Sequence, residues 1–305
     1  MSTPFSDPAI YERPLRACPL CGSARIARLH GIQRYTPPFR VDRCDECGFI
    51  FMNPRFTKRV IRGFYGEDYY RGSAEYAYYD ERRAERFARH VWKARLRVIG
   101  RYADGGNFLD VGAAFGGLLR EASARYSVYG IEPSDYSGSE ARKIFGERVH
   151  IGTLADHPFE DGSFSAITMI EVIEHLADPA DAIRECHRLL RDGGVLVVQT
   201  ANMAGLQARL RGERYAYFMP GHLSYFTRRN LTDLLVRSGF SRVVAYLPVE
   251  FGLVPKLLKS RYAFKSARDY RHWVRIAWYH LISKLHFRDF ALTSSMVLYA
   301  VKRPK

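Results

Sequence analysis

The stretch Phe108–Leu119 constrains the fold of this chain more than any other segment. An apolar run that contains Asp110 turns through Gly112 and Gly116 and then resumes as a second apolar segment. This pattern is typical of a strand, a tight loop and a helix in an α/β domain. Glycines let the backbone close around a ligand at the carboxyl end of such a strand, where open parallel sheets bind their ligands.

A second strand pattern follows, in which the apolar run Val128–Ile131 ends on Glu132 and Pro133. A carboxylate there can accept hydrogen bonds from both hydroxyls of a ribose at the neighbouring strand end. The spacing Gly112-x-x-x-Gly116 differs from the G-x-G-x-x-G spacing of pyrophosphate loops. Two strand-end acids around one glycine loop predict a nucleoside ligand that also carries positive charge, and S-adenosylmethionine (SAM) is such a ligand.

In these residues the chain resembles the class I SAM-dependent methyltransferases, over residues 81–247 and the last strand. The resemblance implies that Asp110 and Gly112 lie near the methionine part of SAM. It also implies that Glu132 holds the ribose and that Gly116 allows close approach of the cofactor. The remaining implied cofactor contacts are Ala113, Pro133, Leu154 and Glu171. An NAD-type or ligand-free Rossmann-like domain is the alternative interpretation.

Strand and helix patterns alternate along the rest of this region. The expected third to seventh strands are His150–Leu154, Ala166–Ile170, Val195–Thr200, Arg242–Leu247 and Ser295–Val301. A helix at Asp181–Leu190 is expected to end at the tripeptide Asp192–Gly194. The resemblance implies a Rossmann-like α/β sheet of seven strands, the last one antiparallel. Related chains often carry an acid where this one has Thr153, which leaves the adenine contact to Leu154.

The fourth strand leads into Glu171, Glu174 and His175, at the sheet edge where reacting groups lie in such folds. The pattern E-x-x-E-H resembles the same region of small-molecule O-methyltransferases, including those of quinone biosynthesis. Three interpretations stay open. His175 could be a general base, because an unperturbed histidine pKa of about 6.5 suits proton removal at neutral pH. The three side chains could instead bind Mg²⁺, or they could orient the start of the next helix.

A long loop with short helices is expected over residues 201–220, the usual place for acceptor-binding insertions in this family. His222 follows this loop and competes with His175 for the role of base. The alternative for His222 is a capping or packing role. The catalytic candidates are therefore His175, His222 and Glu171.

Two C-x-x-C-G knuckles near the start of the chain contain Cys18, Cys21, Cys44 and Cys47. Each knuckle places two thiolates on one turn, and two such turns can complete a tetrahedral zinc shell. Four thiolates leave no open coordination position, so we expect a structural zinc ion that supplies folding energy and no chemistry. A pair of redox-active or vestigial C-x-x-C turns is the alternative.

Three domains are expected: a zinc-ribbon-like module over residues 1–56, a connector over 57–80 and the SAM-dependent methyltransferase domain over 81–305. The connector is rich in tyrosine, and Tyr69 and Tyr70 are candidates for a lid, whereas most of its tyrosines are expected to pack between the domains. Together with the turn Phe51–Arg55, the arrangement resembles bacterial methyltransferases of sugar, polysaccharide and natural-product pathways.

A helical insertion is expected over residues 248–294, before the last strand. One helix in it carries an apolar stripe at helical spacing, made of Tyr270, Trp273, Val274, Ala277, Trp278, Leu281, Ile282 and Leu285. Residues 256–288 contain nine Lys or Arg and one acid, Asp269. Such a segment suits peripheral contact with an anionic membrane, although core packing or dimerisation explains the stripe equally well.

The formal net charge of +15 favours anionic partners. The chain shows no apolar run of transmembrane length and no export signal, and its spaced cysteines fit a reducing compartment. We therefore expect a cytoplasmic protein, with peripheral binding at the inner membrane surface as an open option.

The predicted function is methyl transfer from SAM to a small, anionic acceptor: a saccharide, a nucleotide-linked sugar or a lipid-linked metabolite. One alternative is an RNA methyltransferase that grips phosphates with its zinc module and basic surface. No Asn-Pro-Pro-Tyr type of base-flipping motif follows the fourth strand, which disfavours nucleic acid as the partner. Another alternative is a SAM-binding protein without catalysis. The sequence indicates no oligomeric state.

Overall fold

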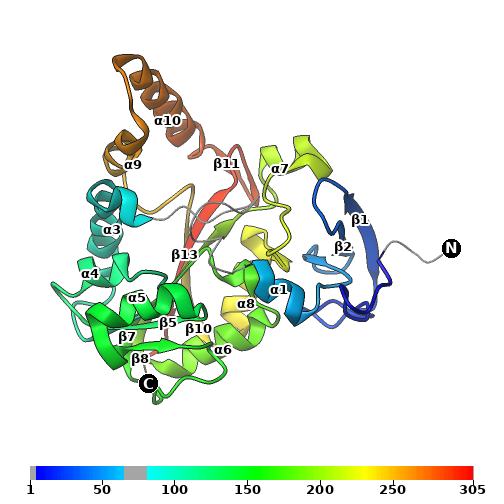
Figure 1. Ribbon diagram of the computed structural model, residues 1–305, viewed down its shortest axis with the longest axis horizontal. Helices are drawn as coiled ribbons and strands as arrows, with labels where there is room; N and C mark the ends of the chain where they lie inside the picture. Colours follow the sequence, from blue (N-terminus) through cyan, green and yellow to red (C-terminus); the bar gives the residue numbers. More distant parts are fainter. Residues whose placement is uncertain (1–4, 65–80, 305) are drawn as a thin grey trace.

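The computed structural model describes residues 5–64 and 81–304 (Figure 1). Its main sheet has seven strands in the order β10-β13-β8-β7-β4-β5-β6. Their bounds are β4 Asn107–Val111, β5 Ser127–Glu132, β6 Val149–Ile151, β7 Phe164–Ile170, β8 Leu190–Ala201, β10 Phe240–Tyr246 and β13 Ser295–Lys302. Strands β4 to β8 run parallel, and β13 is antiparallel to both β8 and β10. The predicted sheet with its antiparallel last strand is confirmed.

Helices cover both faces of this sheet. Helices α3 (Glu85–Ile99), α4 (Gly117–Ala122) and α5 (Asp135–Phe145) share one core, while α6 (Pro179–Leu189) and α8 (Arg228–Arg237) share the other. Along β8, Val197 packs on the first side and Leu196 on the second, because side chains alternate along a strand. A strand covered on both sides needs the continuous apolar run that the sequence shows.

The helix predicted at Asp181–Leu190 ends differently from the prediction. Helix α6 ends at Leu189, and β8 begins at Leu190, so the tripeptide Asp192–Gly194 lies inside β8. Leu190 already pairs with Phe164, and pairing with β7 then resumes only at Val195. The glycines therefore form a bulge within the strand, with Gly193 at φ 73°, rather than the end of the helix.

The N-terminal residues form a second, antiparallel sheet in the order β1-β2-β3-β9. Its strands are β1 Ile26–Ile32, β2 Phe39–Cys44, β3 Ile50–Met52 and β9 Ser224–Tyr225. The last of these comes from the loop region after β8, so the N-terminal sheet is completed by residues that follow the main sheet's strand β8 in sequence. The two parts also share a core, in which Phe39 and Phe56 lie with Phe218 and Tyr225.

Asn53, in the predicted Phe51–Arg55 turn, is buried, and both the nitrogen and the oxygen of its side-chain amide form hydrogen bonds. Its Nδ2 donates to the carbonyl of Leu15 (3.1 Å) and to Oδ2 of Asp42 (2.7 Å), and its Oδ1 accepts from the amide of Leu15 (2.7 Å). The turn therefore ties the N-terminal segment to β2. Helix α1 (Lys58–Phe64) follows, and the connector tyrosines, including Tyr69 and Tyr70, lie outside the described residues.

The insertion between β10 and β13 contains α9 (Leu253–Ser260), α10 (Arg271–Ile282) and a short hairpin of β11 (His286–Phe287) and β12 (Phe290–Ala291). In Figure 1, α9 and α10 extend away from the sheet at the top of the view. Within the described residues, no helix is long and apolar enough to cross a membrane.

Candidate functional site

The loop between β4 and α4 has the tight geometry that its glycines predict. Gly112 and Gly116 adopt φ values of 80° and 77°, which disfavour any residue with a side chain. A Cβ on Gly112 would lie 2.5 Å from Cγ2 of Val172, and one on Gly116 would lie 2.7 Å from Phe145. The amides of Gly112 and Ala113 donate to the carbonyl of Ile131, which fastens the loop to β5. Close contacts with neighbouring side chains and hydrogen bonds to β5 therefore both hold the loop in this tight conformation.

Glu132 lies at the carboxyl end of β5 and is 3% exposed. One carboxylate oxygen accepts from the amide of Ala114 (2.8 Å) and the other from the amide of Ser134 (3.0 Å). A carboxylate offers about four lone-pair positions, so it retains capacity for ribose hydroxyls. Pro133 separates Glu132 from Ser134 and lies at the same strand end.

Asp110 occupies the adjacent strand end and is also buried. Its Oδ1 accepts a hydrogen bond from Oγ1 of Thr168 on β7 at 2.6 Å. This bond fixes the rotamer of the carboxylate beside the glycine loop. The structure thus brings Asp110, Gly112 and Glu132 together on the edge of the sheet where β4 and β5 end.

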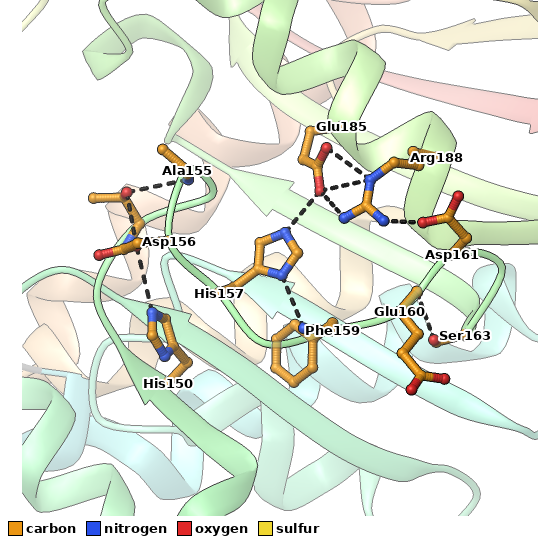
Figure 2. A network of polar contacts seen from close by, with 11 residues as sticks. His150, Ala155, Asp156, His157, Phe159, Glu160, Asp161, Ser163, Glu185 and Arg188 are labelled. Atoms are coloured by element: carbon orange, nitrogen blue, oxygen red, sulfur yellow. Dashed lines mark hydrogen bonds and ion pairs between the residues drawn. The ribbon is translucent and has the colours of Figure 1, made fainter.

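The loop after β6, which carries Thr153 and Leu154, is held by a polar network (Figure 2). Asp156 accepts from the amide of Thr153 at 2.6 Å and from its hydroxyl at 3.0 Å. Farther along the loop, His157 contacts Glu185 of α6 at 2.7 Å. Asp156 is therefore used to shape the loop, and the half-buried Leu154 is left as the apolar surface beside the β6 end.

Glu171 follows β7 with a φ of 55°, an uncommon value for a residue with a side chain. Its amide donates to the carbonyl of Gln199, and Nε2 of Gln199 donates to Oε1 of Glu171 at 2.7 Å. The side chain is accessible at the surface, yet desolvation and the nearby charge of Glu174 raise the pKa of Glu171 to about 8. Strained backbone and a shifted pKa at a strand end are features that cluster at functional sites.

Glu174 is fully buried, and its two oxygens have partners within the protein. The hydroxyl of Tyr217 donates to Oε1, and Oγ1 of Thr200 donates to Oε2 at 3.0 Å. Burial raises the pKa of Glu174 above its usual range. This carboxyl therefore organises the loop after β8, and sequence reasoning missed both of its partners.

His175 and His222 lie against each other, with ring centroids 4.6 Å apart and planes at 74°. Nδ1 of His175 bonds to the carbonyl of Gly221, and Nδ1 of His222 bonds to the carbonyl of Tyr217, each at 2.9 Å. Since a carbonyl only accepts, Nδ1 carries the proton in both rings, and in His222 this leaves a lone pair on Nε2. Burial lowers the pKa of both histidines, so both rings are neutral at neutral pH.

One ligand atom each from Glu174, His175 and His222 lies within 4.8 Å of the others. This set differs from the one that the sequence suggested for Mg²⁺, because His222 takes the place of Glu171. The two oxygens of Glu174 already accept hydrogen bonds.

The four predicted zinc ligands form a compact group. The Sγ atoms of Cys18 and Cys47 are 3.7 Å apart, and those of Cys21 and Cys44 are 3.6 Å apart. All four sulfur atoms lie within 4.8 Å of one another. Thiolates bound to zinc at about 2.3 Å in a tetrahedron are about 3.8 Å apart, so the group fits that ion. Cys186 lies apart from them, buried in the sheet core.

A parallel sheet with a glycine loop and acids at two neighbouring strand ends defines an α/β protein that binds a nucleoside cofactor. The chain belongs to the methyltransferases, since a family model described as a methyltransferase domain matches residues 79–245, more than half of its length. This confirms the family that the sequence predicted, the class I SAM-dependent methyltransferases.

Curated relatives support the same family. The chain is 29% identical over 54% of its length to an uncharacterised 37.1 kDa protein in a transposon of Streptomyces fradiae, with 48% of that protein covered. It is 33% identical over 40% of its length to a probable SAM-dependent methyltransferase of Mycolicibacterium smegmatis, with 46% covered. It is 35% identical over 32% of its length to a ubiquinone biosynthesis O-methyltransferase of Alkalilimnicola ehrlichii, with 43% covered. The chain thus spans less than half the length of these relatives.

Solved structures share the fold. A phosphoethanolamine N-methyltransferase of Haemonchus contortus in complex with SAM has a TM-score of 0.53 and 18% identity, with 84% of this chain and 63% of that chain covered. A SAM-dependent methyltransferase of Archaeoglobus fulgidus has a TM-score of 0.51 and 17% identity, with 72% and 97% covered. At these identities the likeness concerns the fold alone.

Proposed function

We propose that this protein transfers the methyl group of SAM to a small-molecule acceptor. The observation that carries the proposal is the placement of Asp110 and Glu132 at neighbouring strand ends across the closed loop of Gly112 and Gly116. In this proposal Glu132 binds the ribose, and Asp110, Gly112 and Ala113 surround the methionine part. Pro133 and Leu154 lie along the adenosine, Gly116 permits close approach, and Glu171 faces the sulfonium end.

The reaction needs little covalent help from the protein. SAM carries an activated methyl group, so the protein mainly aligns the acceptor with the sulfonium for an in-line displacement. In this proposal His222 takes the acceptor proton, since its Nδ1 proton is held by the carbonyl of Tyr217 and its Nε2 keeps the lone pair. The ring of His175 packs against that of His222 and is the second candidate for this role. Glu174 acts through Tyr217 as a positioning residue, because Tyr217 also holds His222.

The proposed acceptor is anionic and small: a saccharide, a nucleotide-linked sugar or a lipid-linked metabolite. The net charge of +15 supports negative charge on the acceptor, and the likeness to ubiquinone biosynthesis O-methyltransferases supports a small molecule. A lipid-linked acceptor would be presented at the inner membrane surface. RNA is the alternative acceptor, and SAM binding without catalysis is the alternative role.

We also propose that Cys18, Cys21, Cys44 and Cys47 hold a structural Zn²⁺, as the sulfur spacing supports. The ion would stabilise the sheet that β9 completes, and β9 begins two residues after His222. In this way the N-terminal module would form one wall of the acceptor site without taking part in the chemistry.

The test is methyl transfer from radiolabelled SAM to a panel of nucleotide-linked sugars, polyprenyl-linked sugars and bulk tRNA. The proposal expects label in a sugar-containing product, slowed at least tenfold by His222→Ala or His175→Ala with SAM affinity unchanged. The control variant His272→Ala, at an exposed histidine of α10, should transfer the methyl group at the normal rate. Label in tRNA would establish the RNA alternative, and SAM binding without transfer to any panel member would favour the non-catalytic role.

A further inference from the structure

Helix α10 presents an uncovered apolar stripe to solvent. The stripe consists of Tyr270, Val274, Trp278, Leu281 and Leu285, which follow one another at intervals of four, four, three and four residues and are 47%, 73%, 63%, 61% and 63% exposed. Val274, Trp278 and Leu281 lie within α10, where this spacing keeps them on one face, and Tyr270 and Leu285 flank its two ends. Contiguous exposed apolar surface of this kind marks an interaction site.

The other side of α10 is already used for packing. Nε1 of Trp273 donates to Oγ of Ser260 in α9 at 3.1 Å, and the ring of Phe264 lies 6.0 Å from that of Trp273. His280, on this packed side, is buried. The predicted stripe is therefore divided. Trp273 is turned toward α9, Tyr270 packs against Trp273 and Phe264 and stays half-exposed, and Val274, Trp278, Leu281 and Leu285 are exposed. Because α9 already fixes the helix, the exposed side chains are not required for its position.

Exposed cations surround the stripe. They are Lys259, Arg261, Lys265, Arg268, Arg271, Arg275, Lys284 and Arg288. The single acid of this segment, Asp269, has its Oδ2 directed at the amides of Lys265 (2.8 Å) and Ser266 (2.7 Å). The field around the stripe is therefore strongly positive, and it complements an anionic surface.

We propose that the α9–α10 segment docks on an anionic lipid surface. In this arrangement the stripe enters the boundary between headgroups and acyl chains, and the flanking Arg271 and Arg275 contact lipid phosphates. The helix lies in the plane of the interface, in keeping with the lack of a membrane-crossing helix among the described residues. Each cation near an anionic membrane adds to the attraction, and the apolar stripe supplies insertion.

Charge disfavours a second copy of the chain as the occupant. A two-fold contact between two stripes would bring the cations that border one stripe, among them Arg271, Arg275 and Lys284, close to those of the other copy. A nucleic acid would use the cations, but it would leave the aliphatic residues Val274, Leu281 and Leu285 exposed. A lipid surface satisfies both features at once.

The segment projects from the rest of the molecule (Figure 1). It is joined to the site through Arg95, whose Nε donates to Oε1 of Glu250 at 2.5 Å and whose second nitrogen donates to Gln199. Gln199 in turn holds Glu171. Docking would therefore place the acceptor site at a defined distance from the membrane. The inference concerns binding to lipid, and it holds whichever acceptor is methylated.

The test is sedimentation of the full, zinc-loaded protein with vesicles of phosphatidylcholine alone or mixed with phosphatidylglycerol. We expect binding to the mixed vesicles only, decreasing as salt is raised, and a blue shift of tryptophan emission that Trp278→Phe removes. Val274→Asp with Trp278→Asp should weaken binding about tenfold or more, as should Arg271→Glu with Arg275→Glu.

Matched controls are Val236→Asp and Arg237→Glu on α8, where Val236 is 55% exposed outside the segment. Both controls should bind like the unchanged protein, and SAM affinity should be unaltered in every variant, which separates lipid binding from folding and from the proposed reaction. Equal sedimentation with both vesicles, or no effect of the stripe variants, would overturn the inference. A dimer in solution that the stripe variants dissociate would assign the stripe to a second copy instead.

Discussion

The guanidinium of Arg34 donates a hydrogen bond to the carbonyl of Tyr215 at 2.8 Å, although 181 residues separate the two in sequence. The same side chain donates to the carbonyl of Phe218 at 2.5 Å and to that of Glu213. Between these carbonyls lies Tyr217, whose own carbonyl holds His222. Arg34, from the loop between β1 and β2, thus positions the loop that carries a proposed base.

Replacing Arg34 should therefore slow turnover without weakening cofactor binding. We expect Arg34→Gln to lower kcat about tenfold or more, because the His222 ring loses its fixed position. Steady-state kinetics and calorimetry with S-adenosylhomocysteine measure the two quantities. The matched control is Arg43→Gln, at an exposed arginine of β2 in the same sheet. A drop in SAM affinity with kcat preserved would contradict this role.

Glu132 should dominate the affinity for the cofactor. Losing charge-assisted hydrogen bonds to a ribose costs about 1.5–3 kcal/mol each, so we expect Glu132→Gln to weaken SAM binding about tenfold to hundredfold. Isothermal titration calorimetry measures this change. Glu147→Gln, at a glutamate with 91% of its side chain exposed, is the control and should bind SAM normally. Unchanged affinity in Glu132→Gln would remove Glu132 from the ribose site.

Gly112 should tolerate no side chain. Gly112→Ala places a Cβ 2.5 Å from Val172 and strains a backbone at φ 80°, so we expect a loss of about 1–3 kcal/mol in the free energy of unfolding. Chemical denaturation of Gly112→Ala and of Gly112→Ala with Val172→Ala separates the two causes. The double variant should regain only the part of the unfolding free energy that the clash with Val172 removes. Full recovery would show that the positive φ contributes nothing.

The carboxyl of Glu171 should make stability depend on pH. Its pKa is raised from an ordinary 4.5 to about 8, so the folded state binds the proton more tightly than the unfolded state does. Stability from this group is complete below pH 4.5 and is lost as the pH rises toward 8. Denaturation midpoints measured from pH 5 to pH 8 should fall less steeply in Glu171→Gln. A steeper fall of the midpoint in Glu171→Gln would mean that folding does not raise the pKa of Glu171.

Removal of metal should unfold the N-terminal module and abolish turnover. A chelator should lower the Tm, because zinc binding contributes folding energy to such modules. Cys18→Ser should reproduce this effect and reduce the zinc content measured by atomic absorption. Cys186→Ala, at the buried cysteine outside the cluster, should keep its zinc. Equal zinc content in the two variants would exclude Cys18 as a ligand.

Local patterns predicted most of the sheet and its cofactor edge. Apolar runs identify the strands, and the acid that ends a run, such as Glu132, marks the carboxyl end of its strand. The spacing of the cysteines likewise predicted a cluster that the structure assembles from two distant turns, with Cys18 beside Cys47. These features are readable because each depends on residues close together in sequence, and because the order of strands in such sheets follows from their connections.

The tertiary structure alone decided how the N-terminal sheet meets the proposed active site. The sequence by itself determined that His222 follows a long loop, but no local pattern relates it to Arg34 or to Tyr217. Strand β9 has only two residues, so its pairing with β3 depends on the surrounding core rather than on its own propensity. The same holds for α10, whose periodicity predicted one apolar face, while only packing against α9 decided which part of that face stays exposed.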